Sequence, residues 1–358
     1  MDYYIRDVRQ NEETIKDLSL AELINSNLHC MPKSLFKYYS NRKENTYSLD
    51  ALRNNTVYLS EPKAFDDPYD CNIYIEGTEF ALQRLRYYAE MCGVKIDDKW
   101  NYEDLSIKLA EKLYLYSTSG KKLDELYKNR NDSELVRQHN DIFFLTLQNE
   151  LSSPNADGSS YYNAFNKVIN DEYNDIQKMI NRFRVVCFAQ TPYSMLMWSH
   201  YAGLHQGFCI EYETPIYSEE NANIYHNLFP VIYTDTRKDL SQLSLNWNAN
   251  GKLTEYELGD IYKYCLLSKS LDWKYQQEWR LISYDDHITD KYYNCEFFKI
   301  KKVYLGNKMQ SDDRKEIIEI CKSKGIPYTG VIIAPDRFEM KDCNMLCEDC
   351  ERLKRSNK

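Results

Sequence analysis

Chemically active side chains are most concentrated between Val185 and Glu213. A strand-like run of β-branched and aromatic residues begins this stretch, and a second run ends it. Between the two runs lies a short segment that carries Trp198, His200 and Tyr201. Histidine titrates near neutral pH, so His200 is a candidate acid, base or hydrogen-bond donor. The alternative is a histidine that ends a helix and bonds a backbone carbonyl.

A second candidate is the charged pair Glu278 and Arg280. The pattern of residues 272–284 predicts a strand, and its period of two places both charges on one face. Buried charges are costly unless they are paired, so the two residues form either a structural ion pair or part of a cleft. Trp273 and Tyr275 suit the walls of such a cleft, because aromatic rings stack on a nucleotide or nicotinamide ring.

Lys37 is the third candidate, within a strand-like segment at 34–40. A lysine between aromatic residues can bind phosphate as a point charge. The alternative is that its ammonium group extends to solvent while its stem packs on the protein.

The loop 63–71 contains Asp66, Asp67 and Asp70 around a proline. Three carboxylates can coordinate a divalent cation through hard oxygen ligands. They can equally fix the loop by accepting hydrogen bonds from nearby backbone amides, and the proline favours this turn interpretation.

The sequence has 11 cysteines, and only Cys343, Cys347 and Cys350 are clustered. These three could supply zinc ligands, or they could be ordinary residues of a terminal helix. The polar start of the chain and the lack of a long apolar run predict a cytoplasmic protein with free thiols and no membrane span. The formal charge of -9 disfavours a broad nucleic-acid-binding surface.

The order of helical and strand patterns predicts an α+β fold with a mixed or antiparallel split sheet and a large helical insertion. Strands are expected at 34–40, 56–62, 227–235, 272–284, 296–306 and 329–340, and a helix with a Ser and Asp cap at 311–325. The expected organisation is an N-terminal helical extension at 1–30, a discontinuous core at 31–77 and 184–335, a helical insertion at 78–183, and a C-terminal tail at 336–358.

Four motifs in order carry a resemblance to a known family: LFKYYS, YLSEPKAFDDPYDC, CFAQ with MLMWSHYAGLHQGFCIEYE, and YQQEWRLIS. Together they resemble domain of unknown function family 2971, over residues of about 34–76 and 184–306. The sequence departs from the expected pattern at Asp66, where asparagine is usual, and at Ala189, where serine is common.

The motif order is also similar to that of ADP-ribosyltransferase-like folds, which bind NAD between two small sheets. That likeness implies Lys37 on the first strand, Tyr58 and Ser60 on the second, and Glu278 as the late glutamate, although the usual first-strand residue is arginine or histidine. Together with the residue chemistry above, the candidate catalytic residues are Glu278, His200 and Tyr201. The candidate cofactor-binding residues are Lys37, Tyr38, Tyr58, Ser60, Phe65, Asp67, Trp198 and Arg280.

The resemblance to family 2971 implies a bacterial defence or toxin-like effector. The likeness to ADP-ribosyltransferase-like folds implies that it uses NAD as a substrate, as an ADP-ribosyltransferase or an NAD glycohydrolase. Glu278 would stabilise positive charge on the ribose. Two alternatives remain open: a metal-dependent nuclease or phosphoesterase that uses Asp66, Asp67, Asp70 and Glu278 around Mg²⁺, and a non-catalytic sensor or partner-binding protein. The expected partners are NAD or another nucleotide, a protein or nucleic-acid target, and a second copy or a defence-system partner.

Overall fold

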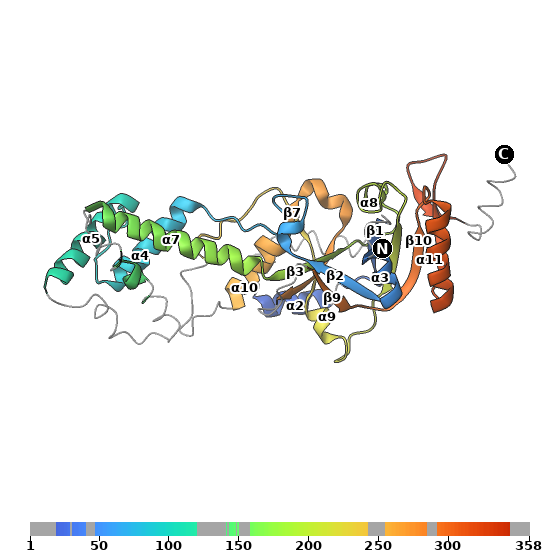
Figure 1. Ribbon diagram of the computed structural model, residues 1–358, viewed down its shortest axis with the longest axis horizontal. Coiled ribbons are helices and arrows are strands. Elements are labelled where there is room, and N and C mark those ends of the chain that lie inside the picture. Colours follow the sequence, from blue (N-terminus) through green and yellow to red (C-terminus); the bar gives the residue numbers. More distant parts are fainter. Residues whose placement is uncertain are drawn as a thin grey trace.

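The computed structural model places two five-stranded sheets in the middle of the molecule, with a helical lobe at one end and helix α11 near the other (Figure 1). Both helices and sheets are prominent, which confirms the expected α+β class. The structure describes residues 19–28, 31–40, 47–119, 141, 143–147, 149, 158–242, 255–284 and 292–343.

The first sheet has the strand order β1-β4-β10-β11-β12. These strands are β1 (Ser34–Tyr39), β4 (Phe208–Glu213), β10 (Ile300–Leu305), β11 (Tyr328–Ile333) and β12 (Met340–Asp342). Only β10 and β11 pair in parallel among the strands of this sheet. Helix α11 (Ser311–Lys324) makes the crossover that a parallel pair requires.

The second sheet has the order β5-β8-β3-β2-β9 and is antiparallel throughout. Its strands are β5 (Leu228–Pro230), β8 (Trp279–Tyr284), β3 (Phe183–Phe188), β2 (Thr56–Ser60) and β9 (Tyr292–Glu296). A separate parallel pair is formed by β6 (Ile232–Thr234) and β7 (Ser268–Ser270).

The two sheets meet at one backbone bridge. The Phe36 amide donates to the Ala189 carbonyl at 2.9 Å, and the Ala189 amide donates to the Phe36 carbonyl at 2.7 Å. This bridge holds β1 of the first sheet beside the end of β3 in the second. The stretch at 185–213 is the predicted strand, helix, strand unit, because β3 leads through α8 (Met195–His200) to β4. It passes from one sheet to the other.

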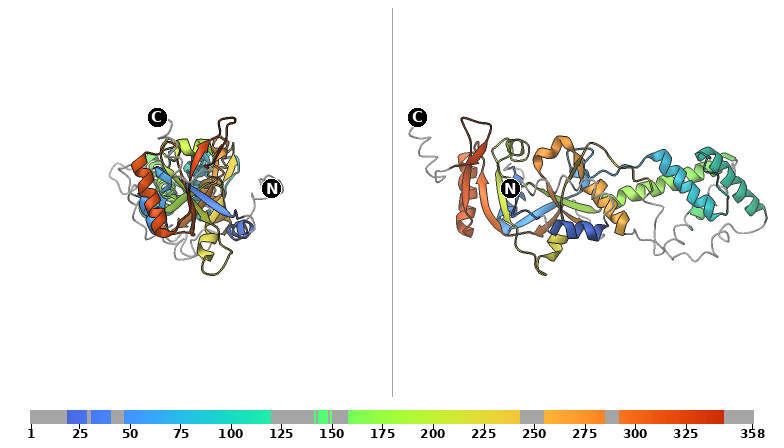
Figure 2. Two further views of the ribbon diagram at one scale, coloured as in Figure 1. Left: turned by 90° about the vertical axis from the view of Figure 1, so that its right-hand side faces the viewer. Right: turned by 180° about the vertical axis from the view of Figure 1, so that it is seen from behind.

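A hydrophobic core fills the space between the sheets and receives side chains from both. Phe188 and Phe297 stack there with ring centroids 4.5 Å apart. A second core covers the other face of the β3 and β8 region, where helices α2 (Leu20–Leu28) and α10 (Glu255–Ile261) pack (Figure 2). This part also contains α3 (Tyr47–Asn54), α9 (Ala222–His226) and a π-helical segment (Tyr262–Leu266).

The stretch predicted as a helical insertion contains α4 (Gly77–Met91), α5 (Tyr102–Thr118) and α7 (Gly158–Ile180). These helices share a hydrophobic core of their own. Inside it, the Arg84 guanidinium and the Tyr88 hydroxyl both donate to the buried Glu172 carboxylate. These helices therefore pack mainly on one another, while Phe80, Ile169 and Ile180 also join the core beside β3 and β8.

Two predicted strands are in fact two strands each. The segment 227–235 divides into β5 and β6, because the Val231 amide donates to the Glu278 carbonyl and the Ile232 amide donates to the Leu267 carbonyl. The segment 329–340 contains β11 and the first residue of β12. β12 thus lies in the stretch expected as a C-terminal tail.

The predicted cap of α11 is also different, since the residue that precedes the helix is Gln310 and its side chain makes no cap hydrogen bond. Among the candidate zinc ligands, Cys343 is half-buried and forms no disulfide with another described cysteine, and Cys347 and Cys350 lie outside the described residues.

Candidate functional site

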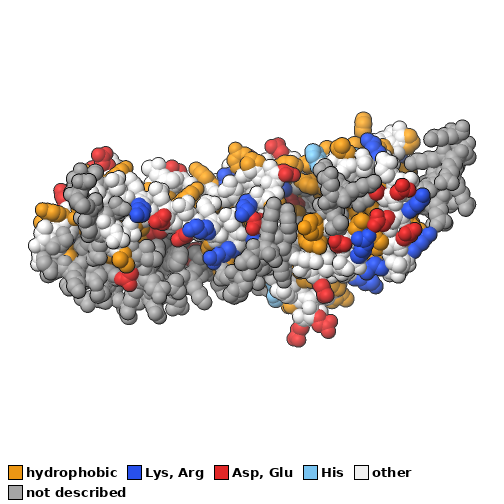
Figure 3. Space-filling view, viewed as in Figure 1, with side chains coloured by type: hydrophobic (Ala, Val, Ile, Leu, Met, Phe, Trp, Pro, Cys, Tyr) orange, Lys and Arg blue, Asp and Glu red, His pale blue; other side chains and the backbone are white. Residues whose placement is uncertain are grey.

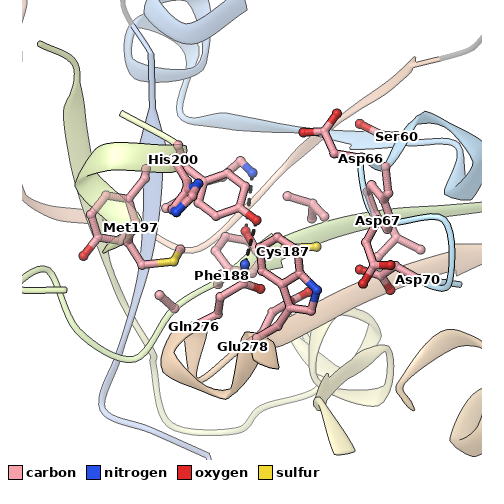
Figure 4. A pocket seen from close by; sticks show the side chains of 18 of the residues that line it. Ser60, Asp66, Asp67, Asp70, Cys187, Phe188, Met197, His200, Gln276 and Glu278 are labelled. Atoms are coloured by element: carbon pink, nitrogen blue, oxygen red, sulfur yellow. Dashed lines mark hydrogen bonds between the residues drawn. The ribbon is translucent and has the colours of Figure 1, made fainter. Parts of the chain in front are cut away.

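A cavity of about 400 Å³ lies where the two sheets meet (Figure 4). Strands β1, β2 and β3, helix α8 and the segment that precedes β8 all contribute to its lining. Figure 4 shows His200 and Met197 on one side of the cavity and Asp66, Asp67 and Asp70 on the other. The cavity has the size of an ordinary small-ligand site.

Most of the predicted site residues line this cavity, although they come from distant parts of the chain. They are Lys37, Tyr38, Tyr58, Ser60, Phe65, Asp67, His200, Tyr201 and Glu278. The residues expected at the first-strand, second-strand and late-glutamate positions therefore face one space.

Two predicted cofactor-binding residues do not line the cavity. Trp198 is fully buried, and its indole nitrogen donates to the Pro192 carbonyl at 2.7 Å. Its ring packs edge-on against Tyr38 at 5.3 Å, so Trp198 supports the wall from behind. Arg280 is also fully buried and acts through the residues that it holds. The expectation of direct ligand contact is wrong for both.

Glu278 belongs to a buried group of four charges. Its Oε1 accepts from Arg280 Nε at 2.6 Å, and its Oε2 accepts from Lys269 Nζ at 2.9 Å. Asp70 contacts the same two cations, at 2.9 Å from Lys269 Nζ and 2.7 Å from Arg280. Two carboxylates thus balance two cations, and each is held by both, which is how a buried charge avoids a large desolvation cost.

The backbone around Glu278 is fixed by its neighbours. Its amide donates to the Tyr233 hydroxyl at 2.9 Å, and its carbonyl accepts from the Val231 amide at 2.9 Å. Gln277, just before it, has a left-handed backbone with φ of 46°. This turn ends a short 3₁₀ helix (Leu271–Gln276) and aims Glu278 toward the cavity. The period-two prediction that Glu278 and Arg280 share a face is correct.

The four buried charges should make the free energy of unfolding fall at acidic pH. Burial alone would raise the pKa of Glu278, but Arg280 and Lys269 outweigh it and lower that pKa from 4.5 to about 2. A carboxylate with a lowered pKa in the folded protein contributes stability above its unfolded pKa, and this contribution is lost as pH falls toward the folded pKa. We expect the unfolding free energy, measured with urea, to fall between pH 4.5 and about 2. The Glu278→Gln variant should show a shallower fall over the same range, and an unchanged slope would contradict this role.

Lys37 is half-buried and differs from the other cations of the site. Its Nζ lies 3.4 Å from the Cys187 carbonyl and faces the rings of Tyr39 and Phe188 at 5.5 and 6.0 Å. Within the described part of the chain, no carboxylate lies at ion-pair distance from it. Burial lowers the pKa of Lys37. The cavity therefore offers a cation whose charge is not balanced by a direct partner.

Two of the loop aspartates, Asp67 and Asp70, act as a turn residue and an ion-pair partner, and Asp66 lines the cavity. Asp67 accepts from the Tyr69 amide at 2.9 Å, which is the predicted Asx-type contact. Asp70 is committed to Lys269 and Arg280. In the ranges that the structure describes, no group of three or more His, Cys, Asp or Glu side chains is placed to hold a metal ion.

His200 ends α8 and is exposed at the cavity. Its ring lies 6.3 Å from the Tyr201 ring and 6.2 Å from the Tyr275 ring. The position leaves the imidazole accessible to a ligand. Within the described residues, the His200 ring makes no hydrogen bond to a backbone carbonyl, which was the alternative role for this histidine.

Sequence reasoning missed two important residues of the site. Lys269 lies in β7, a strand of three residues with no hydrophobic pattern to mark it. Gln276 is a neutral residue at the end of the 3₁₀ helix, and only its contacts with Lys269 and Tyr201 reveal its role. Both residues precede Glu278 by fewer than ten positions, but Lys269 contacts Glu278, and Gln276 contacts Lys269, only after the chain has turned.

The surface charges, the helices and the cysteines can be compared with what the composition predicts. Figure 3 shows Lys and Arg interspersed with Asp and Glu on the face drawn. Every helix in the described ranges is too short or too polar to cross a membrane. The described cysteines form no disulfides with one another, and burial raises the pKa of Cys71, Cys187 and Cys209. Buried thiols of this kind are poor nucleophiles.

One family model matches the chain, with the description "Protein of unknown function (DUF2971)", over residues 197–281. No curated protein matches the chain. No solved structure matches it either. The match is narrower than the range expected from the motifs and leaves out β1 and β2. The match supports the resemblance to DUF2971 over residues 197–281, the part of the chain that carries His200, Tyr201, Lys269 and Glu278.

Proposed function

We propose that the cavity binds the nicotinamide end of NAD and that the protein breaks the bond between nicotinamide and ribose. The observation that supports this proposal is the meeting of Lys37 on β1, Tyr58 and Ser60 on β2, and Glu278 before β8 around one cavity between two sheets. That is the arrangement implied by the likeness to ADP-ribosyltransferase-like folds.

The chemistry requires a fixed negative charge and a place for phosphate. When the glycosidic bond breaks, its electron pair leaves with neutral nicotinamide and positive charge develops on the ribose. A carboxylate held in place, such as Glu278, stabilises that charge. Water or a target nucleophile then donates a lone pair to the ribose carbon and releases its proton to solvent. Lys37 offers its charge to the diphosphate.

Water as the nucleophile gives NAD hydrolysis, and a target side chain gives ADP-ribosyl transfer. Loss of NAD or modification of a target would each suit the defence or toxin-like role expected from the sequence.

One observation favours a second candidate, a nucleotide sensor that binds without turnover. Both oxygens of Glu278 are already engaged by Arg280 and Lys269, so its negative charge is shared with two cations. A carboxylate in that state stabilises a ribose cation less than an unpaired one does. The same cavity would then recognise NAD and report its presence.

Incubation with NAD labelled in the nicotinamide ring separates these candidates. We expect the purified protein to release free nicotinamide, and the release to persist in the presence of a chelator. The Glu278→Gln variant should lose about 10²- to 10³-fold of the rate, the usual effect of removing one transition-state contact. Binding of NAD without release of nicotinamide would support the sensor. Failure to bind NAD would overturn both candidates.

The variant needs a matched control, because Glu278 also holds the buried charges. Glu213→Gln removes an exposed carboxylate at the end of β4 and should leave the rate unchanged. Thermal unfolding of each variant shows whether it is folded at the assay temperature. If folded Glu278→Gln releases nicotinamide at the original rate, the assignment of Glu278 fails.

A further inference from the structure

Tyr201 is connected to the buried charges through a chain of hydrogen bonds. Lys269 Nζ donates to Gln276 Oε1 at 2.9 Å, and Gln276 Nε2 donates to the Tyr201 hydroxyl at 2.6 Å. Gln276 is 2% exposed. Tyr201, Gln276, Lys269 and Glu278 all border the cavity. The chain thus runs from the buried ion pairs to a hydroxyl group at the ligand space.

The direction of these bonds follows from the chemistry of the groups. A lysine ammonium carries only donors, so the amide oxygen of Gln276 must face Lys269. The amide nitrogen of Gln276 then faces Tyr201, and it too can only donate. The Tyr201 oxygen is therefore the acceptor in this bond. Its own proton must point to a different acceptor.

In the described residues, no protein acceptor for the Tyr201 proton is found beside the hydroxyl. The hydroxyl borders the cavity, so its proton is available to a ligand. Burial raises the pKa of Tyr201 to about 12, and Lys269 opposes this only in part. The group stays protonated around neutral pH.

We propose that Tyr201 is a directed hydrogen-bond donor to the carboxamide oxygen of the nicotinamide ring, and that Gln276 is the positioning residue that fixes its direction. The proposal rests on the proposed function. The carboxamide is the acceptor chosen because Tyr201 is connected through Gln276 and Lys269 to Glu278, the residue assigned to the nicotinamide–ribose bond. It gives the site a means to recognise the group that leaves.

The test compares two ligands that differ by the nicotinamide ring, NAD and ADP-ribose, with affinities measured by calorimetry. Tyr201→Phe should weaken the binding of NAD roughly three- to tenfold, the range of one neutral hydrogen bond. It should leave the binding of ADP-ribose unchanged. A general distortion of the cavity would weaken both ligands, so ADP-ribose distinguishes recognition from structure.

Gln276 is tested by a double-mutant cycle with Gln276→Met, which removes the amide without adding charge. The single change should weaken the binding of NAD because Tyr201 loses its fixed direction. In the Tyr201→Phe background, Gln276→Met should have no further effect on NAD. Thermal unfolding verifies that each variant is folded.

The outcomes separate the two levels of the argument. If wild-type protein binds NAD and Tyr201→Phe weakens NAD and ADP-ribose equally, or weakens neither, the donor assignment is overturned while the proposed function stands. If the two substitutions act additively on NAD, the positioning role of Gln276 is overturned. If wild-type protein does not bind NAD, the proposed function fails and the donor assignment fails with it.

Discussion

Replacement of Arg280 by methionine should destabilise the protein by about 3–5 kcal/mol, the usual cost of removing one partner from a buried ion pair. Arg280 is fully buried and contacts both Glu278 and Asp70. Without it, two buried carboxylates share the single charge of Lys269. Urea unfolding monitored by circular dichroism measures the change as a shift in midpoint at constant slope.

The matched control is Arg53→Met, which removes an arginine from an exposed ion pair. Arg53 lies 2.7 Å from Glu316, and their side chains are 42% and 46% exposed. Exposed pairs contribute about 0–1 kcal/mol, so this variant should unfold close to the wild-type midpoint. If Arg280→Met and Arg53→Met lower the unfolding free energy equally, the buried ion pairs of Arg280 contribute no more to stability than an exposed pair does, and the prediction is wrong.

Replacing one cation and one anion of the buried group together tests whether its four charges depend on one another. Lys269→Met combined with Glu278→Leu deletes one cation and one anion and leaves Asp70 paired with Arg280. The double variant should cost less than the sum of its single changes, because neither remaining charge loses its last partner. Additive costs would mean that the four residues act as independent contacts.

Several parts of this arrangement were accessible from sequence because they depend on local periodicity. Alternation along a strand was enough to place Glu278 and Arg280 on one face, and their carboxylate and guanidinium do meet, at 2.6 Å. The run at β2 follows the same rule, since its buried and half-buried residues alternate. β1 is instead marked by its aromatic residues, and its burial does not alternate.

Other parts depend on tertiary contacts that leave no periodic trace. Lys269 sits in a three-residue strand whose position is fixed by pairing with β6, so the sequence around it resembles a loop. Trp198 was assigned to the cavity by its chemical type, but its large ring fits a gap behind Tyr38 and is fully buried. Which wall a side chain faces is decided by how α8 packs, and spacing alone does not specify that.

Replacement of Lys37 should have the opposite effect to replacement of Arg280: it should weaken ligand binding strongly and should not lower the free energy of unfolding. Lys37→Met should weaken NAD binding at least tenfold, because a charge-assisted hydrogen bond contributes about 1.5–3 kcal/mol. Calorimetric titration with NAD measures this loss. Lys33→Met, which changes an exposed lysine just before β1, is the control and should bind NAD as wild type does.

The expected stability of Lys37→Met follows from the sign of the pKa shift. Burial lowers the pKa of Lys37, so between that value and 10.5 the unfolded chain binds more protons than the folded protein, and stability rises with pH there. At neutral pH, which lies below the unfolded pKa, the lowered pKa of Lys37 therefore opposes folding. Lys37→Met should be at least as stable as wild type at neutral pH, and its stability should rise less toward alkaline pH. A variant that both binds NAD normally and loses stability would identify Lys37 as a structural residue.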